Sequence, residues 1–223
     1  MSTNERAKTG DWVDVSVPLH PHLPVWPGNS HFRLVQHRSV SGGDQTNDSK
    51  LEMDLHSGTH LEGSRHLRDS GESPADRNAA DFIMPIFVTD SGPSPQVGTE
   101  HVPKTLDGAR GLLFKTSNTY RNLWAEVAFT PDYCALDEPA AQLASRLPNL
   151  ALVGIDYLSI QAPSQPLAVH EHFLDAGIVV LEGLDLHGVN EGHYEMLCLP
   201  IRIPDAESAP CRVLLRPSTE RLA

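Results

Sequence analysis

The chain has 223 residues, of which 39% are hydrophobic, so it can bury the core of one large domain. Acidic residues outnumber basic ones by 29 to 17, a formal net charge of −12, which excludes a general attraction to nucleic acid or to an anionic membrane. No apolar run reaches the ~20 residues that cross a bilayer, and the polar N-terminus lacks the apolar stretch of a secretion signal, so we expect a cytoplasmic protein with a neutral or cationic small-molecule partner.

The first part of the chain predicts one strand followed by loops. We expect residues 1–10 to be flexible, and residues 12–17 alternate apolar and polar side chains as a half-buried strand does. A proline-rich loop over residues 20–28 follows, stiff enough to hold Trp26 at a set position, either in a pocket wall or at the edge of the core. Residues 39–50 and 68–78 are rich in small polar and turn-forming residues, so both are expected to be loops.

The second part alternates predicted helices and strands. Residues 135–147 have helical spacing of apolar side chains, and the compact apolar run at 152–156 suits a buried strand. Residues 169–176 fit a short helix that stops at Gly177, and the β-branched residues 178–182 fit another strand. This order predicts an α/β protein. Further apolar runs cover residues 82–88, 111–114, 196–203 and 211–215. The last two of these form a strand-like pair.

Histidine is the most informative residue type, because it is the commonest metal ligand and titrates near neutral pH. His56, His60 and His66 lie with Glu62 in one segment of eleven residues, and four of the remaining histidines lie around Glu182. Ligating atoms must converge to ~2.0–2.2 Å from a metal ion, whereas a straight strand would separate His56 from His60 by ~13 Å. We therefore expect a tight bend at Gly58.

The ligands offered by this segment are two imidazole nitrogens and one or two carboxylate oxygens. That set suits zinc, manganese or ferrous iron better than copper or a thiolate-seeking ion. His66 either completes the ligand shell or acts as an acid/base. The alternative is a solvated polar loop, which is the usual explanation of an isolated pair of histidines four residues apart.

Two downstream residues are further candidates. His170 begins the predicted helix at 169–176, and Glu182 ends the strand at 178–182. Sites in α/β proteins gather at the ends of strands, which favours a functional role for both. Taken singly, each is more typical of a surface residue.

Several motifs together resemble the metal-dependent cyclase-like hydrolase family, which includes bacterial kynurenine formamidases and isatin hydrolases. The first is H-x-G-T-H-x-acid-x-x-x-H over residues 56–66, and the second is Gly-Ile-Asp-Tyr-Leu-Ser over residues 154–159. Val-His at 169–170 and Val-Leu-Glu at 180–182 follow in the family's order. Matching segments also occur near both ends of the chain, so the resemblance covers most of it.

The resemblance implies a single swivelling β/β/α-type domain over residues 1–223, assembled as a homodimer or higher oligomer. It also implies one or two divalent ions per chain, Zn²⁺ or Mn²⁺. The implied metal ligands are His56, His60, Glu62, His170 and Glu182, the last two closing a second metal position. His66 matches the family's acid/base histidine, and Trp26 matches an aromatic residue that lines the substrate pocket.

The motif departs from the family's pattern at two positions. Glu62 stands where the family usually has Asp, which moves the carboxylate by ~1.5 Å, and Ser64 stands where it usually has Pro. The implied activity is hydrolysis of a carbonyl C–N or C–O bond, as in an aryl formamide, a cyclic amide or a lactone. The alternatives are a natural-product cyclase, dehydratase or isomerase with the same site, and a non-catalytic binding protein with the same fold.

Overall fold

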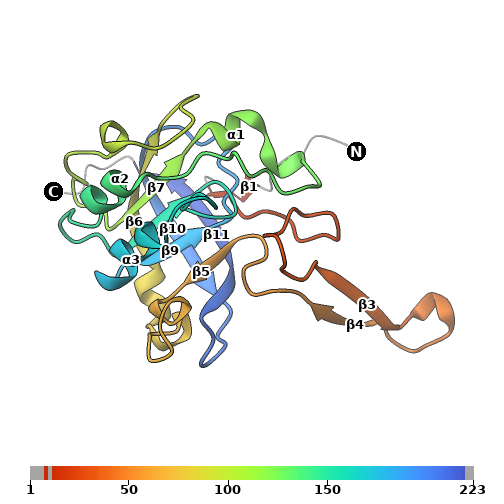
Figure 1. Ribbon diagram of the computed structural model, residues 1–223. Coiled ribbons are helices and arrows are strands. Elements are labelled where there is room, and N and C mark those ends of the chain that lie inside the picture. Colours follow the sequence, from red (N-terminus) through yellow and green to blue (C-terminus); the bar gives the residue numbers. More distant parts are fainter. Residues whose placement is uncertain (1–7, 10–11, 219–223) are drawn as a thin grey trace.

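The computed structural model describes residues 8–9 and 12–218, so most of the segment expected to be flexible lies outside the described residues. It shows a mixed α/β protein built around a β-barrel, with few helices (Figure 1). The strands are β1 (Lys8–Thr9), β2 (Trp12–Asp14), β3 (Arg33–Arg38), β4 (Asp48–Glu52), β5 (His60–Glu62), β6 (Ile83–Asp90), β7 (Gly111–Lys115), β8 (Leu152–Ile155), β9 (Val179–Glu182), β10 (Gly192–Pro200) and β11 (Ser208–Pro217). The α-helices are α1 (Ser117–Arg121), α2 (Glu138–Ala144) and α3 (Ala168–Asp175). Short 3₁₀ helices cover Val40–Gly42, Ser64–His66, Pro74–Asp76, Ala79–Phe82, Thr99–His101 and Leu123–Ala125.

The barrel is a closed ring of seven strands. They follow the order β11, β10, β6, β7, β8, β9 and β5, and β5 pairs back onto β11. The run from β6 to β9 is parallel, and the other pairings in the ring are antiparallel. Closure leaves the ring without the free edges that an open sheet exposes.

The apolar runs in the sequence correspond to strands that are buried on both faces. In β7, Leu112 and Phe114 pack outward against the helices, whereas Leu113 points into the barrel. The same alternation continues in β8 and β9. Every residue of these three strands is buried, which is why they appear in the sequence as continuous apolar segments rather than alternating ones.

Helices α2 and α3 pack against each other and against the outer face of the parallel strands (Figure 1). The predicted helix at 135–147 is shorter in the structure, because Asp137 caps the start of α2 and Leu136 instead forms β-bridges. Helix α3 agrees with the prediction, and Gly177 follows it with φ of +72°. Among the described residues, no helix has the length and hydropathy needed to span a bilayer.

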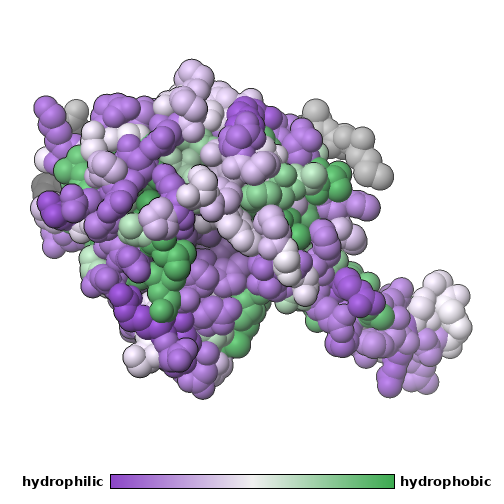
Figure 2. Space-filling view, viewed as in Figure 1, coloured by the Kyte–Doolittle hydropathy of each residue, from purple (hydrophilic) through white to green (hydrophobic). Residues whose placement is uncertain are grey.

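Strands β3 and β4 form a two-stranded arm that projects away from the barrel (Figure 1). The prediction of a loop over residues 39–50 is wrong at its end, because β4 begins at Asp48. Nearly every residue of both strands is exposed, and hydrophilic residues cover most of the arm (Figure 2). A strand without a core-facing side carries little hydrophobic periodicity, which explains why the sequence did not indicate it.

Candidate metal centre

The bend expected at Gly58 is present and brings His56 back beside His60. Gly58 has φ of +68°, and its carbonyl oxygen accepts a hydrogen bond of 2.9 Å from His60 Nδ1. The ring centroids of His56 and His60 lie 5.0 Å apart. Gly183 abuts the bend so closely that a Cβ there would come within 2.0 Å of the Gly58 oxygen. The bend is therefore fixed against the end of β9.

Strand β5 divides its three side chains between the core and the site. Leu61 packs into the barrel, while His60 and Glu62 point to the outer face. The antiparallel register places His60 opposite Glu182, the last residue of β9. Because residues directly opposite in antiparallel strands share a face, this register alone brings a histidine and a carboxylate from distant parts of the chain together.

Glu62 lies at the centre of the cluster. Its Oε1 is 2.8 Å from His56 Nδ1, 3.5 Å from His60 Nε2 and 3.9 Å from His66 Nε2. Its Oε2 is 3.3 Å from Nε2 of His170, which arrives from α3. The histidines of the 56–66 segment and the downstream His170 therefore meet at one carboxylate.

Glu182 forms the other acidic wall of the cluster. Its Oε2 is 3.5 Å from His60 Nε2, and its Oε1 is 3.2 Å from His170 Nε2. The backbone N–H of Ile160 and the hydroxyl of Ser159 donate to Oε1 over 2.7 and 3.2 Å. Of the four histidines near Glu182 in the sequence, only His170 contacts it in the described structure.

The loop after β8, which carries Ser159 and Ile160, is anchored by Asp156. The backbone N–H and hydroxyl groups of Thr116 and Thr119 donate four hydrogen bonds of 2.6–3.2 Å to this wholly buried carboxylate. Burial raises the pKa of Asp156, and these hydrogen bonds partly offset that effect. The carboxylate therefore ties the start of α1 to the loop that supports Glu182.

The charges in the cluster perturb one another strongly. Burial by itself would lower the pKa of His60 and of His170, but the carboxylates of Glu182 and Glu62, 3.2–3.5 Å from their Nε2 atoms, outweigh it and raise both to about 10. Burial would raise the pKa of Glu62 and of Glu182, but the histidines hold both below the usual range. The cluster is thus built to contain positive charge between two carboxylates.

A divalent ion fits this donor set. In the described part of the chain, two triplets of side chains bring ligand atoms within 4.8 Å of one another: His56, Glu62 and His66, and His60, Glu62 and Glu182. His60 Nε2 and Glu62 Oε2 are buried without a hydrogen-bond partner, which is costly for polar atoms unless something else occupies their lone pairs. Imidazole and carboxylate groups are ligands that zinc and manganese accept.

The cluster opens into a pocket with a volume of about 520 Å³. Trp26 lies in its wall and packs edge-on against Phe129, with ring centroids 5.3 Å apart. His66 also lines it and is partly exposed, and burial lowers its pKa. Both residues therefore lie where a molecule in the pocket would contact them.

The polar residues that line the pocket without having been singled out in the sequence include Asp54, Gln161 and Glu207. Asp54 accepts from the backbone N–H of His56, Gln161 contacts His170, and Glu207 lies 3.4 Å from His56 Nε2. Asp54 could have been suspected from its nearness to the motif. Glu207 carries no comparable signal, because the turn between β10 and β11 brings it in from the far end of the chain.

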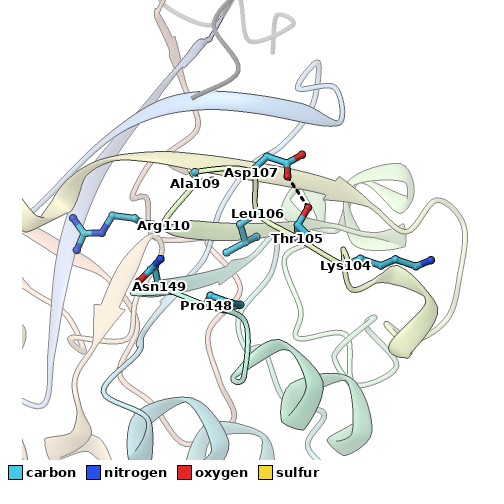
Figure 3. A pocket seen from close by; sticks show the side chains of 9 residues that line it. Lys104, Thr105, Leu106, Asp107, Ala109, Arg110, Pro148 and Asn149 are labelled. Carbon is cyan, nitrogen blue, oxygen red and sulfur yellow. Dashed lines mark hydrogen bonds between the residues drawn. The ribbon is translucent and has the colours of Figure 1, made fainter. Parts of the chain in front are cut away.

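A second hollow, of about 450 Å³, is lined by residues 104–110 and 148–149, just before β7 and β8 begin (Figure 3). The histidines lie at the other end of the parallel strands, next to the loop after β8 and the last residue of β9. Its two cationic side chains, Lys104 and Arg110, point away from each other (Figure 3). The Thr105 hydroxyl is already paired with Asp107 at 2.7 Å. The lining of this hollow brings no ligand or acid/base groups together, so the histidine cluster is the stronger candidate.

The chain is similar to known proteins over most of its length. Residues 13–162 match the family model described as "Putative cyclase". The kynurenine formamidase of Bacillus cytotoxicus is 28% identical over 94% of this chain and 99% of its own length. A predicted metal-dependent hydrolase from Bacillus stearothermophilus has the same fold, with a TM-score of 0.75, 25% identity, and coverage of 92% of this chain and 97% of that one. Isatin hydrolase A from Labrenzia aggregata, solved with benzyl benzoate, shares the fold at a TM-score of 0.76 and 18% identity, over 92% and 93% of the two chains.

Proposed function

The chain belongs to the cyclase family, and on that basis we propose that it is a divalent-metal-dependent hydrolase of a carbonyl C–N or C–O bond. The observation that carries the proposal is the pair of unpartnered buried atoms, His60 Nε2 and Glu62 Oε2, inside a cluster of imidazoles and carboxylates. Kynurenine formamidases and isatin hydrolases among the similar proteins support hydrolysis as the reaction. The substrate class is an aryl formamide, a cyclic amide or a lactone.

The metal ligands in this proposal are His56, His60, Glu62, His170 and Glu182, holding one or two ions of Zn²⁺ or Mn²⁺. A bound ion of this kind would polarise the substrate carbonyl and lower the pKa of water towards ~7. Glu62 belongs to both candidate triplets, so its two oxygens decide whether one ion or two can be held. The Ser159 hydroxyl and the Ile160 N–H hold the Glu182 carboxylate in place and would keep it oriented when an ion binds.

His66 acts as the acid/base in the proposal. It lines the pocket, and its lowered pKa keeps the ring neutral near neutral pH, so that one ring nitrogen is free to accept a proton. The same nitrogen can then deliver that proton to the nitrogen or oxygen of the leaving group. It is more exposed than any of the proposed ligands, so it is the imidazole that a substrate in the pocket can reach most easily.

The charge of the pocket narrows the substrate further. In the described structure none of its lining residues is Lys or Arg, whereas Asp54 and Glu207 remain as acids outside the proposed ligand set. Trp26 supplies an aromatic face and Leu158 an apolar one. Neutral or cationic aryl substrates are therefore favoured over those that carry a carboxylate.

Metal analysis and activity measurements test the proposal together. Purified protein should contain at least one divalent ion per chain, and His170→Ala should lose the metal and the activity together. His172→Ala is the matched control, because His172 lies on the same helix and contacts Glu138 instead of the cluster. The assay uses a panel of aryl formamides, isatin-like lactams and lactones, and mass spectrometry should show the gain of one water. Activity that survives complete metal removal, or a product that has lost water, would overturn the proposal.

We further propose that the chain acts as one domain of the swivelling β/β/α type and assembles as a homo-oligomer through the β3–β4 arm. A two-stranded hairpin is marginally stable in water on its own, yet this arm exposes Leu34 and Leu51, opposite each other, at 62% and 49%. A second copy of the chain would cover them. Leu34→Asp should shift sedimentation velocity towards the monomer, while Val127→Asp, at an exposed residue of the barrel domain, should not.

A further inference from the structure

Gln161 contacts His170 on the side of the ring that faces away from the carboxylates. Its Oε1 lies 3.3 Å from His170 Nδ1, while His170 Nε2 faces Glu62 and Glu182. The amide Nε2 of Gln161 donates to the backbone oxygen of Gln165 at 3.5 Å. Because that carbonyl can only accept, the amide oxygen must be the atom that faces His170.

This orientation determines where the proton on His170 lies. An amide oxygen accepts but cannot donate, so His170 Nδ1 must carry the hydrogen. The Nε2 lone pair of the neutral ring then points between two carboxylates, where only a cation is favourable. His60 is arranged in the same way, with Nδ1 donating to the Gly58 oxygen and Nε2 facing the same two carboxylates.

The backbone of Gln161 is fixed by its surroundings. Its N–H donates to Ser159 Oγ at 3.3 Å, its oxygen accepts from the Tyr133 hydroxyl, and it forms a β-bridge with Leu136. The residue is buried, so water offers His170 Nδ1 little competing hydrogen bonding. Ligating histidines commonly need such a partner on the second nitrogen, and removing it typically lowers metal affinity 10- to 100-fold.

We propose that Gln161 is a positioning residue that holds His170 in the Nδ1–H form and so prepares its Nε2 to bind a divalent ion. The inference rests on the proposed function. It adds the residue that sets how tightly the part of the site containing His170 binds a divalent ion. In this assignment Gln161 does not bind the ion itself, although it lines the pocket. Its effect reaches the reaction only through the geometry and tautomer of His170.

Zinc titration with a competing chromophoric chelator tests the assignment. Gln161→Leu keeps the size of the side chain but removes the acceptor, so Zn²⁺ affinity should fall about 10- to 100-fold. Gln161→Glu restores an acceptor and should bind Zn²⁺ at least as tightly as the unaltered protein. Gln165→Leu changes a side chain in the same loop that does not contact His170. It should alter the affinity less than about twofold, well below the 10- to 100-fold loss expected for Gln161→Leu.

A spectroscopic measurement on the unaltered protein is independent of how the variants fold. Long-range ¹H–¹⁵N correlation spectra of the zinc-loaded protein should show His170 protonated at Nδ1. A proton on Nε2, or Zn²⁺ affinity in folded Gln161→Leu equal to that of the unaltered protein, would overturn the assignment alone. An unaltered protein that takes up no divalent ion would overturn the proposed function as well.

Discussion

Replacing Glu62 by the aspartate usual in the family should weaken the site rather than improve it. Aspartate is one methylene shorter, which withdraws the carboxylate by ~1.5 Å. The contacts of 2.8 Å to His56 and 3.3 Å to His170 would then lengthen to roughly 4 to 5 Å. The backbone cannot follow, because β5 is paired on both sides, Glu62 with Val180 and with Ser208.

The expected loss follows from the number of contacts broken. An oxygen withdrawn by ~1.5 Å no longer reaches an ion that the histidines hold, and a charged contact of this kind contributes about 1.5–3 kcal/mol. Losing one such contact should weaken metal binding about 10- to 100-fold, at 1.4 kcal/mol for each factor of ten. Losing both should leave at most one ion per chain.

Inductively coupled plasma mass spectrometry gives the metal content, and titration with a competing chelator gives the affinity. Glu207→Asp is the matched control, since it shortens a carboxylate that touches only Nε2 of His56. It should lower metal affinity less than about threefold, which is less than the loss of one charged contact. Unchanged or tighter metal binding by Glu62→Asp would refute the reasoning. It would mean that the histidines close in on the shorter side chain.

Three other predictions follow from the described contacts. Zn²⁺ binding near pH 7 should release protons and tighten as pH rises, because His60 and His170, with pKa of about 10 in the metal-free protein, must each lose a proton to bind an ion. Calorimetry in buffers of different ionisation enthalpy counts the released protons, and a count of zero would contradict the prediction. Asp156→Ala leaves four buried donors without an acceptor and should lower the free energy of unfolding, measured in urea, by about 3 kcal/mol or more. A loss below ~1 kcal/mol would contradict this prediction. Gly58→Ala puts a Cβ on a residue with φ of +68° and 2.6 Å from Leu19 Cδ2, so it should lower the free energy of unfolding by about 1–2 kcal/mol and weaken Zn²⁺ binding. Unchanged stability and unchanged Zn²⁺ affinity would count against the role of the bend.

Much of the barrel could be predicted because its strands carry strong local signals. The runs at 152–156 and 178–182 and the helix at 169–176 agree with β8, β9 and α3 within about a residue. The bend at Gly58 was also predictable, since two histidines four residues apart can approach each other only if the chain turns. In each case the physical constraint acts within a few residues of sequence.

Other parts depended on pairings that a single sequence does not reveal. The arm was missed because β3 and β4 face solvent and lack an apolar side. Nothing local indicates that β5 lies between β9 and β11, and that placement brings Glu182 and Glu207 to the histidines. Gln161 was missed for a different reason: a glutamine in a loop becomes informative only when its amide is seen against a histidine ring.

The position of β5 in the ring also affects when the site can form during synthesis. His60 and Glu62 emerge from the ribosome early, yet their strand acquires its second neighbour only when β11, at Ser208–Pro217, has been made. A half-made chain therefore contains most of the proposed ligands but lacks β11, the strand that fixes the position of β5. On the proposed function, metal uptake therefore waits until β11 has been made, and damage to β11 should release the ion before it unfolds the rest.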